Sequence, residues 1–579
     1  MKQTIHSKRT LGSLLLACSM VFSFVTASAQ VGGAGETYSV STAQQKRGVL
    51  LEEFTGIHCG YCPQGHAVGH TLMRATDLIT VVAVHAGYFA VPQMDEPDFR
   101  IEEGEALNTY FGVSSYPSGL VNRQWFTDYG TYVTGRSSWT AETKRLSAED
   151  APLNLLATAT YHQATRLVDV RVEGYFTASI QSDSLALNVL WTQNNIIGPQ
   201  NGGNMGEEYV HQHMLRGFVS PLWGDALPVN PAAGTYFAKN YSFTLPSQLN
   251  EADVKPEDVR IVAFVTDGKG DVQQVTKCLP ACEGYSAPLS ALLGEPKIPI
   301  GTYYGFQFFD VELQSTTTDT IRTATFDITV NGISHTAEWN GCLPPMETQT
   351  LRLPCSYDVV DNALNSWRIS LQSLNGQAAS CEPLQGDFSA PIAATPQIKL
   401  TLKTNKEASD NHFRILDAEG NVVKEFGPFA DGEVTNLTED YTLEPNKVYC
   451  FEAADDWGNG IYSPAGYYTL RSSDGSVIQQ VYELPAFGVR SFFTTTKTAE
   501  AIREVLTAEG LAEVFDLNGR SLGTMRPARR HLPAARRADG SHHEIHCEIK
   551  DTGRHAPAWL HPTNPDPLFT GRLPKLSFL

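Results

Sequence analysis

The order of hydrophobic and polar residues changes near residue 150. Before that point, continuous apolar runs at 47–56 and 79–85 predict buried strands, while 64–75 and 98–111 predict helices. After it, apolar and polar residues alternate in short runs between turn residues, which is typical of antiparallel sandwiches. These runs are 153–160, 167–176, 184–192, 259–266, 305–313 and 323–330. We therefore predict an α/β domain followed by two or three antiparallel β-sandwich domains, Ig-like or jelly-roll-like.

At 579 residues, the chain is too long for a single hydrophobic core. The changes of texture locate the boundaries between its parts. We predict a signal peptide at 1–29, a linker at 30–45, the α/β domain at 46–150, a β-sandwich at 151–283, a β-rich domain at 284–395, a second sandwich at 396–498, a short β-domain at 499–534 and a disordered tail at 535–579.

The first residues have the composition of an export signal. Lys2, Lys8 and Arg9 precede an apolar stretch at 11–25, and Ala27-Ser28-Ala29 then supplies a small-residue cleavage site, so the mature chain is expected to begin at Gln30. A lipid attachment at Cys18 is the alternative. No later run of about 18 apolar residues occurs, so no transmembrane helix is expected in the mature chain.

The composition is that of a globular protein, with 42% hydrophobic and 18% charged residues. A formal net charge of −20 disfavours nucleic acid as a partner, because phosphate backbones require a concentrated basic face. Export also permits disulfides, so six cysteines are candidates for structural pairs. These are Cys278, Cys282, Cys342, Cys355, Cys381 and Cys450.

One short motif carries redox chemistry. Cys59-Gly60-Tyr61-Cys62 follows a predicted buried strand and precedes a predicted helix. At a helix N-terminus, unpaired N–H groups and the helix dipole stabilise the thiolate of the first cysteine. Cys62 lies one turn further on, where it can resolve a mixed disulfide on Cys59.

This order of elements resembles the thioredoxin superfamily, in which a buried acid and a cis-proline accompany the dithiol. Glu53 and Pro117 stand at the matching positions here. The resemblance implies that Cys59 is the nucleophile, that Glu53 assists proton transfer with Cys62, and that Pro117 shapes a substrate groove together with Tyr61 and Tyr116. The direction of exchange depends on a reduction potential that the motif does not encode.

Other interpretations of the motif stay open. The cysteines could belong to a zinc site with nearby His58, His66 and His70, although zinc generally needs a fuller ligand set. They could also form a purely structural disulfide in a fold that has lost catalysis. The Gly-Tyr dipeptide departs from the Gly-Pro of thioredoxins, and an insertion at 88–97 could cover part of the site.

A second distinctive segment follows at 194–217, and it contains an Asn-Gly-Gly turn and the pair His211 and His213. A thioredoxin-like start joined to this segment resembles the Omp28-like family of outer-membrane-associated proteins of Bacteroidetes, over residues 46–283. The resemblance implies a protein of the cell surface, the outer membrane or the periplasm, with envelope or surface proteins as partners. The two histidines, placed on one side of a strand, could hold a metal or simply pack together.

A Gly-rich acidic loop in the last sandwich is a candidate Ca²⁺ site. Asp455, Asp456 and Asn459 offer side-chain oxygens around a tight turn, which is the kind of ligand that Ca²⁺ prefers. The EF-hand spacing is missing, and a simple polar turn is the alternative. No cofactor is otherwise required by the predicted chemistry.

The C-terminal region changes character twice. Residues 511–522 resemble the opening of a type IX secretion sorting domain, so 499–534 is interpreted as a partial one. From 535 to 579 the chain holds five of the 16 histidines and neither valine nor tyrosine, which favours an out-of-frame tail. Cys547 in this tail has no evident partner.

Two functions follow from these observations. One is thiol–disulfide exchange on envelope proteins by an oxidoreductase-like domain. The other is a non-catalytic surface adhesin or binding protein that uses the thioredoxin fold as a scaffold. The local residues favour the first function, whereas the long β-rich body favours the second.

Overall fold

The computed structural model describes residues 30–32, 36–93, 95–127, 130–285, 287–298, 308–355, 365–388, 391–461, 466–497, 512–515 and 521–525. The chain divides into two compact units, Met1–Lys497 and Thr498–Leu579. The predicted signal peptide at 1–29, the predicted tail at 535–579 and most of the predicted sorting domain lie outside the described residues.

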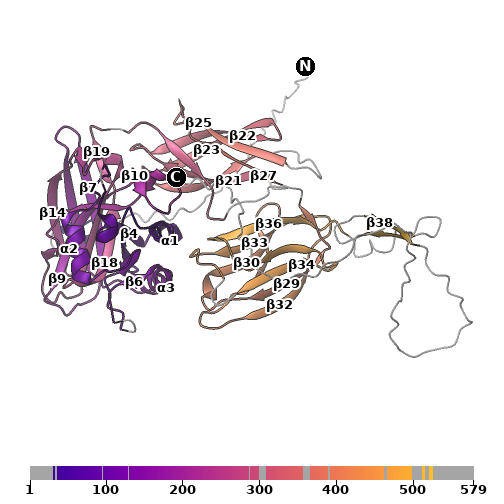
Figure 1. Ribbon diagram of the computed structural model, residues 1–579, viewed down its shortest axis with the longest axis horizontal. Helices are drawn as coiled ribbons and strands as arrows, with labels where there is room; N and C mark the ends of the chain where they lie inside the picture. The colour runs from indigo at the N-terminus through magenta and orange to yellow at the C-terminus, as the bar shows by residue number, and fades with distance from the viewer. Residues whose placement is uncertain are drawn as a thin grey trace, which may run out of the picture. The chain divides into compact units, whose positions relative to one another are not determined.

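A nine-stranded mixed sheet organises the first part of the chain (Figure 1). Its strand order is β18-β17-β9-β12-β4-β3-β5-β6, and β13 pairs with β9. The strands are β3 (Val49–Thr55), β4 (Ile79–His85), β5 (Ser118–Val121), β6 (Thr134–Gly135), β9 (Leu185–Gln193), β12 (Met214–Phe218), β13 (Asp225–Ala226), β17 (Val259–Asp267) and β18 (Gly270–Cys278). β3 and β4 are parallel, and every residue in both is buried, because both faces of the sheet are covered.

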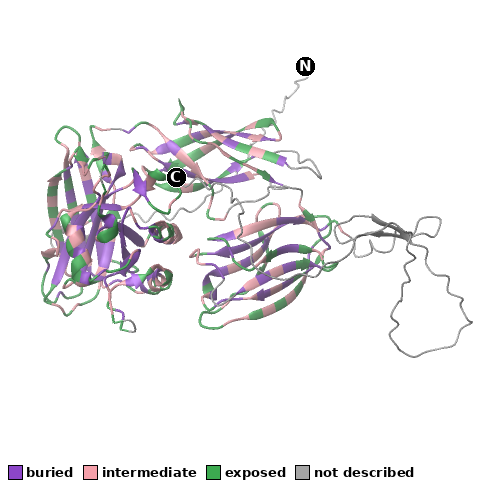
Figure 2. Ribbon diagram, in the orientation of Figure 1, coloured by how far each residue is buried: buried purple, intermediate pink, exposed green. Residues whose placement is uncertain are grey.

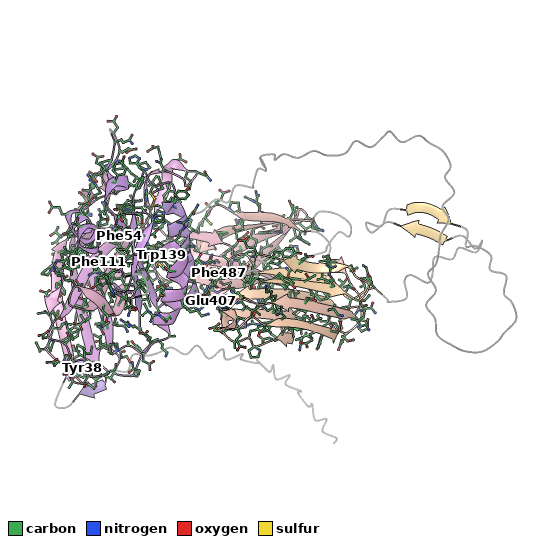
Figure 3. All side chains as sticks on the ribbon, turned by 60° about the horizontal axis from the view of Figure 1, so that its bottom comes forward. Tyr38, Phe54, Phe111, Trp139, Glu407 and Phe487 are labelled. Carbon is green, nitrogen blue, oxygen red and sulfur yellow. A yellow bond between two sulfur atoms is a disulfide. The ribbon has the colours of Figure 1, made fainter. Side chains whose placement is uncertain are left out.

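Three helices pack on the two faces of this sheet. α1 (Cys62–Ala75) and α3 (Arg136–Ser147) share a core with the odd-numbered residues of β3, while α2 (Glu102–Phe111) packs on the even-numbered ones. Phe54 and Phe111 belong to the core on the α2 side of the sheet, and Trp139 belongs to the core under α1 and α3 (Figure 3). The sequence predicted α1 and α2 but not α3, which is a short, mostly polar helix.

A second sheet completes a sandwich over part of the first one. It contains β7 (Leu153–His162), β8 (Leu167–Phe176), β14 (Tyr236–Thr244) and β19 (Pro280–Glu283), in the order β14-β8-β7-β19. Apolar residues of β7 and β8 share a core with the odd-numbered residues of β9 and β17. The strands that line this core are predominantly buried in Figure 2.

The first sheet extends across the predicted domain boundary at 150. β9, β12, β17 and β18 follow that boundary in the sequence, yet they extend the sheet begun by β3 and β4. The junction is the parallel pairing of β12 with β4, where the Ala83 N–H donates to the His213 carbonyl at 2.8 Å. The α/β segment and the following β-segment therefore share one sheet.

Two further sandwiches follow in the same unit. The first has sheets β20-β21-β24 and β23-β22-β25-β26, with β27 also on β25. Its strands are β20 (Ala291–Gly294), β21 (Phe308–Ser315), β22 (Ile321–Val330), β23 (Ile333–Leu343), β24 (Thr348–Pro354), β25 (Asn365–Leu374), β26 (Gln377–Ala378) and β27 (Leu384–Phe388). Phe309 and Phe326 are fully buried in its core.

The other sandwich has sheets β28-β36-β33-β30-β31 and β32-β29-β34-β35. Its strands are β28 (Ile392–Ala393), β29 (Gln397–Lys403), β30 (Asn411–Leu416), β31 (Val422–Phe426), β32 (Asn436–Thr442), β33 (Val448–Asp455), β34 (Tyr467–Ser472), β35 (Val477–Val481) and β36 (Gly488–Thr494). Phe413, Phe451 and Tyr468 pack in its centre. The multidomain β-sandwich architecture predicted from the alternating runs is confirmed.

The remaining pairs are small two-stranded ribbons. They are β1 (Gln30–Gly32) with β2 (Glu36–Tyr38), β10 (Ile196–Gln200) with β11 (Gly206–His211), and β15 (Gln248–Leu249) with β16 (Ala252–Asp253). In the second unit, β37 (Ala512–Phe515) pairs with β38 (Ser521–Met525). The chain also has short 3₁₀ turns, η1 (Tyr88–Ala90), η2 (Pro256–Asp258) and η3 (Ala408–Asp410).

The cysteines differ from the expectation of several structural disulfides. Among the described residues, the only disulfide joins Cys59 and Cys62, and the six later cysteines are free thiols. Burial raises the pKa of Cys278 to about 12 and that of Cys355 to about 11, so these thiols are held protonated. The prediction that these six form structural pairs is wrong for this structure, since export permits disulfides but does not bring cysteines together.

Candidate functional site

The dithiol lies at the junction of β3 and α1. Cys62 is the first residue of α1, and its sulfur is bonded to that of Cys59, with the two Cα atoms 5.4 Å apart. Pro63 is accommodated in the first turn, where an N–H has no intrahelical partner to lose. Cys59 is only 2% exposed and Cys62 is fully buried. The disulfide therefore occupies the helix start that the motif predicted, but beneath the surface.

Glu53 lies against the inner face of α1. A β-carbon placed on Gly65 would overlap Oε1 of Glu53, and one on Gly69 would lie 3.6 Å from Oε2. The Glu53 carboxyl is 1% exposed, and its Oε1 has no hydrogen-bond partner. Burial raises the pKa of Glu53 well above its ordinary value, which favours the protonated acid. The structure therefore holds a buried carboxylic acid beside the first turns of the helix.

Pro117 packs on the same stretch of α1. The Tyr116–Pro117 peptide bond is cis, and the Pro117 Cβ lies 2.9 Å from the β-carbon position of Gly65. Tyr116 turns toward α2, where its hydroxyl donates to Oδ1 of Asn108 at 2.6 Å. Tyr61 instead is 65% exposed, with the Arg136 guanidinium 6.0 Å from its ring centroid. Of the two predicted groove tyrosines, Tyr61 is the one open to solvent.

The segment at 88–97 contacts the dithiol loop, as expected of an insertion near the site. The His58 N–H donates to the Phe89 carbonyl at 2.9 Å, and Nε2 of His58 lies 2.9 Å from the Glu96 carboxylate. A β-carbon on Gly56 would overlap the Phe89 backbone, so this position tolerates only glycine. His58 is therefore paired with a carboxylate and does not share a metal site with the cysteines.

A polar pair that the sequence did not predict lies behind Glu53. Nδ1 of His66 is 2.7 Å from the Tyr209 hydroxyl, and Nε2 is 2.9 Å from Oγ1 of Thr55. The same Nε2 lies 3.9 Å from Oε1 of Glu53. Burial lowers the pKa of His66 to about 3, so the ring is neutral and has one donor and one acceptor nitrogen. Tyr209 comes from β11, more than 140 residues along the chain.

Two more histidines, His85 and His211, are buried near this pair, and His213 is partly buried. The His85 and His211 ring centroids are 5.1 Å apart, and both rings contact Phe99. Burial lowers the pKa of His211 to about 4 and of His213 to about 3. The expectation that His211 and His213 share one side of a strand is wrong, because β11 ends at His211 and His213 has a φ of 55°.

The turn of the β10–β11 hairpin lies on the dithiol loop. The side-chain amide of Gln200 donates to the Cys59 carbonyl at 3.0 Å and to the Gly56 carbonyl at 3.2 Å. The Asn201 N–H donates to the Ile57 carbonyl at 2.8 Å. The sequence identified 194–203 as a distinctive segment, but only the fold shows that this segment contacts the dithiol loop.

The acidic loop of the last sandwich has a different organisation from that of an open ion site. The two carboxylate oxygens of Asp455 accept hydrogen bonds from the N–H groups of Trp457, Gly458 and Gly460. Oδ2 of Asp456 lies 3.2 Å from Nε2 of His412, and the Asn459 amide donates to Glu407. These residues hold the turn together and do not converge on one point. The Ca²⁺ site stays a prediction.

Two statements about metals and membranes apply to the described part of the chain. There, no group of three or more His, Cys, Asp or Glu side chains is placed to hold a metal ion. Nor does any helix within those residues have the length and apolarity needed to cross a membrane.

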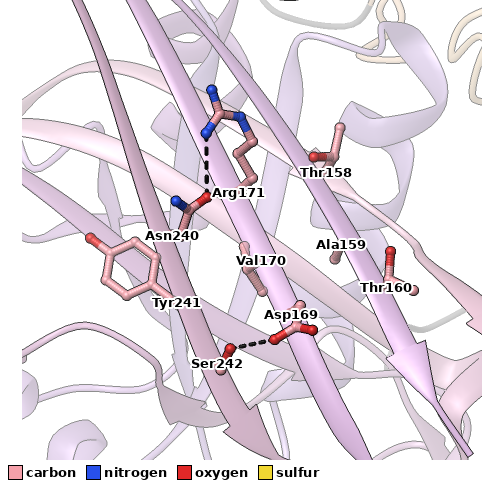
Figure 4. A pocket seen from close by; sticks show the side chains of 9 residues that line it. All are labelled: Thr158, Ala159, Thr160, Asp169, Val170, Arg171, Asn240, Tyr241 and Ser242. Carbon is pink, nitrogen blue, oxygen red and sulfur yellow. Dashed lines mark hydrogen bonds between the residues drawn. The ribbon is translucent and has the colours of Figure 1, made fainter.

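A shallow polar depression of about 300 Å³ lies on the second sheet (Figure 4). Arg171 donates to Oδ1 of Asn240 at 3.4 Å, and the Ser242 hydroxyl donates to Asp169. Exposed Thr158 completes this hydrogen-bonding surface across β7, β8 and β14. The depression is separate from the dithiol in sequence and in its strands.

The fold and the site define a β-rich protein whose first sheet carries a covered dithiol. Residues 104–282 match the family described as Outer membrane protein Omp28. The resemblance predicted from the sequence is thereby confirmed, as is the exported location at the outer membrane or cell surface.

Comparison with solved structures found two similar proteins from Porphyromonas gingivalis. HBP35 is 18% identical, covers 54% of this chain and 99% of its own, and superposes with a TM-score of 0.33. A domain of the outer membrane lipoprotein Omp28 is 21% identical, covers 23% and 92% respectively, and has a TM-score of 0.17. Comparison with curated proteins found no match.

Proposed function

We propose that this Omp28-family protein exchanges disulfides with envelope proteins through a thioredoxin-like site at Cys59 and Cys62. The observation that carries the proposal is the combination of one disulfide at the start of α1 with a buried acid against the same helix. A purely structural disulfide needs no proton carrier, and a buried carboxyl oxygen without a hydrogen-bond partner, such as Oε1 of Glu53, costs stability. The presence of Glu53 at this cost favours a chemical role.

The exchange begins when a substrate thiolate attacks Sγ of Cys59. The Cys59–Cys62 bond breaks, Cys62 leaves with the bonding electron pair, and protonated Glu53 supplies the proton that neutralises its thiolate. A second substrate thiolate then attacks the substrate sulfur of the mixed disulfide and releases Cys59 as a thiolate. Two electrons pass from the substrate dithiol to the protein, and the reduced protein runs the same steps in reverse on a substrate disulfide.

The helix N-terminus assists both directions. The N-terminal end of the α1 dipole carries partial positive charge, which stabilises negative charge on Cys59. Such stabilisation lowers the thiol pKa from about 8.5 and makes Cys59 the better leaving group and nucleophile. Pro117, packed against Gly65, keeps the loop before β5 beside the dithiol.

Turnover by the whole mature chain tests this proposal. A fragment of residues 46–150 is unsuitable, because β4 would lose its partner β12. We expect dithiothreitol-dependent insulin reduction by the wild-type chain, and none above background for Cys59→Ser. Cys278→Ser, which changes a free and partly buried thiol, should retain activity. Equal rates for wild type and Cys59→Ser would overturn exchange as the function.

A non-catalytic binding protein is the second candidate. The covered disulfide is compatible with a scaffold, and the depression across β7, β8 and β14 offers hydrogen-bonding groups to a polar ligand. Arg171→Ala and Ser242→Ala would weaken adhesion to a surface ligand under this alternative. Retained adhesion in both variants would exclude the depression as the adhesive surface.

A further inference from the structure

The exchange proposed above leaves Glu53 without the proton that it gives to Cys62. The Glu53 side chain is 1% exposed, and its Oε1 has no hydrogen-bond partner. A carboxylate in this place is a buried charge, which is costly unless a donor or a counter-ion balances it. Every further cycle therefore needs a group that returns a proton to this carboxyl from outside the core.

His66 is placed to return that proton. Among the described residues, it is the only basic side chain within 4 Å of a Glu53 oxygen, with Nε2 3.9 Å from the unpartnered Oε1. Proton transfer requires an approach to about 3 Å. A rotation of the Glu53 carboxyl about its terminal torsion, which is a soft one, brings the two atoms closer. The His66 side chain is 17% exposed, so it lies between the buried acid and the surface.

Both ring nitrogens of His66 face hydroxyl groups. Nε2 is 2.9 Å from Oγ1 of Thr55, and Nδ1 is 2.7 Å from the Tyr209 hydroxyl. A hydroxyl can donate or accept, so either neutral tautomer of this ring makes both hydrogen bonds. Nε2 of His211 instead faces the Pro199 carbonyl at 3.2 Å, which can only accept and therefore fixes the tautomer. His66 can change its tautomer without losing a hydrogen bond.

Tyr209 links the His66 ring to the surface. It lies on β11, is partly exposed, and follows the exposed Glu207 and Glu208 along the strand. Burial lowers the pKa of His66 to about 3 and raises the pKa of Tyr209, so neither side chain readily becomes an ion. A proton must then enter the ring at Nδ1 while another leaves it at Nε2, so that both groups stay neutral.

We propose that Tyr209 and His66 form a proton relay that reloads Glu53 from solvent. The proposal rests on the exchange function proposed above. The Glu53 carboxylate takes the proton on Nε2 of His66, Nδ1 takes the hydroxyl proton of Tyr209, and solvent returns one proton to the Tyr209 oxygen. One proton is thus taken up for each carboxylate that is neutralised. When the dithiol is oxidised again, the same shift runs outward and restores the first tautomer.

The rate at which the Glu53 carboxyl exchanges its proton with solvent tests the relay. The oxidised mature chain is mixed rapidly into D₂O, and infrared spectroscopy follows the C=O band of the protonated carboxyl. The band that is missing from Glu53→Gln identifies Glu53. This measurement needs no substrate and no turnover, so it does not depend on the exchange function.

We expect Tyr209→Phe to slow this deuteration at least about tenfold, and Tyr88→Phe, at an 82% exposed side chain, to stay within about twofold of wild type. A merely structural role for the His66–Tyr209 contact predicts the opposite sign, because a loosened fold admits solvent to Glu53. Equal or faster deuteration in Tyr209→Phe would overturn the relay. So would the absence of a protonated-carboxyl band from Glu53.

A second pair keeps the test decisive if Tyr209→Phe does not fold. His66→Gln retains a polar side chain but cannot take a proton at one atom and release another, so it should also slow deuteration at least about tenfold. His70→Gln changes an exposed histidine one turn further along α1 and should match wild type. Equal rates in these two variants would overturn the part of His66.

Insulin reduction separates the relay from the exchange function. If the relay reloads Glu53, Tyr209→Phe should turn over at least about tenfold more slowly than Tyr88→Phe. Equal turnover by these two variants would overturn the role of the relay in exchange. Equal turnover by wild type and Cys59→Ser would instead refute the exchange function, and slowed deuteration in Tyr209→Phe would still show the proton path to Glu53.

Discussion

Gly65 provides the space that the Glu53 carboxyl occupies against α1. A β-carbon at this position would overlap Oε1 of Glu53 and would lie 2.9 Å from Cβ of Pro117. The acid, the helix and the proline are therefore packed around one missing side chain. Gly69, one turn further on, has only ordinary contacts, at 3.4 Å to Val81 and 3.6 Å to Glu53.

Alanine at these two glycines should have opposite effects on stability. Gly69→Ala should stabilise by up to about 1 kcal/mol, because alanine is the better helix former and fits the space. Gly65→Ala should destabilise by about 1–3 kcal/mol, because Glu53 or Pro117 must shift. Urea unfolding, followed by hydrogen exchange of peptides from β3, measures the change in unfolding free energy of both variants. Stabilisation by Gly65→Ala would show that Glu53 does not pack there.

Glu53→Gln should change how stability depends on pH. Burial raises the folded-state pKa of Glu53 above the ordinary value of 4.5, so between these two values the native chain holds a proton that the unfolded chain has released. Wild-type stability therefore falls as pH rises through this window, and this fall is complete above the folded pKa. The glutamine variant lacks this fall, so its free energy of unfolding should increase relative to that of wild type as the pH rises above 4.5. Glu207→Gln, on exposed β11, is the control and should follow wild type.

Tyr209→Phe should leave Nδ1 of His66 without its partner. The loss of this 2.7 Å hydrogen bond at a partly buried ring is expected to cost about 1–3 kcal/mol of unfolding free energy. Tyr88→Phe removes a hydroxyl from a side chain that is 82% exposed, and it should change stability by less than about 0.5 kcal/mol. Hydrogen exchange of α1 peptides reports the difference. Equal protection in the two variants would contradict the His66–Tyr209 contact.

Acid should destabilise the first sheet through its buried histidines. The native-state pKa is about 3 for His66, about 4 for His211 and about 3 for His213, against an ordinary value of 6.5. Their contribution is fully present above pH 6.5 and is lost as pH falls below it, by about 2 kcal/mol for each at pH 5. His211→Gln should reduce the loss between pH 7 and pH 5 by about that amount.

The buried ion pair between Glu52 and Arg123 should be sensitive to the removal of either partner. The guanidinium donates to both carboxylate oxygens at 2.6 Å, and neither side chain is more than 1% exposed. Arg123→Met should cost about 3–5 kcal/mol because it leaves a buried charge unpaired. The double variant with Glu52→Leu should recover most of this loss. A double variant as unstable as Arg123→Met would show that packing of the arginine, not charge, is what matters.

Much of the dithiol site could be predicted from local sequence. The CxxC motif, the preceding apolar strand and Pro63 specify a helix start within a few residues, and β4 follows its predicted range of 79–85. Glu53 and Pro117 were predicted from the resemblance to the thioredoxin superfamily, because they stand at positions that match its buried acid and its cis-proline. Their packing around Gly65 could not be predicted, because it depends on how β3, α1 and the loop before β5 meet in space.

The tertiary structure determined which residues lie next to the dithiol. Alternation along β7 and β8 predicts strands with one buried face, but periodicity contains no information on which strand pairs with which. Pairing of β12 with β4 brings the 196–211 hairpin onto the dithiol loop and Tyr209 onto His66. Contacts between residues about 140 positions apart follow from burial of the whole sheet. For that reason the sequence alone predicts the dithiol and the helix that follows it, whereas the tertiary fold determines which residues pack over the dithiol.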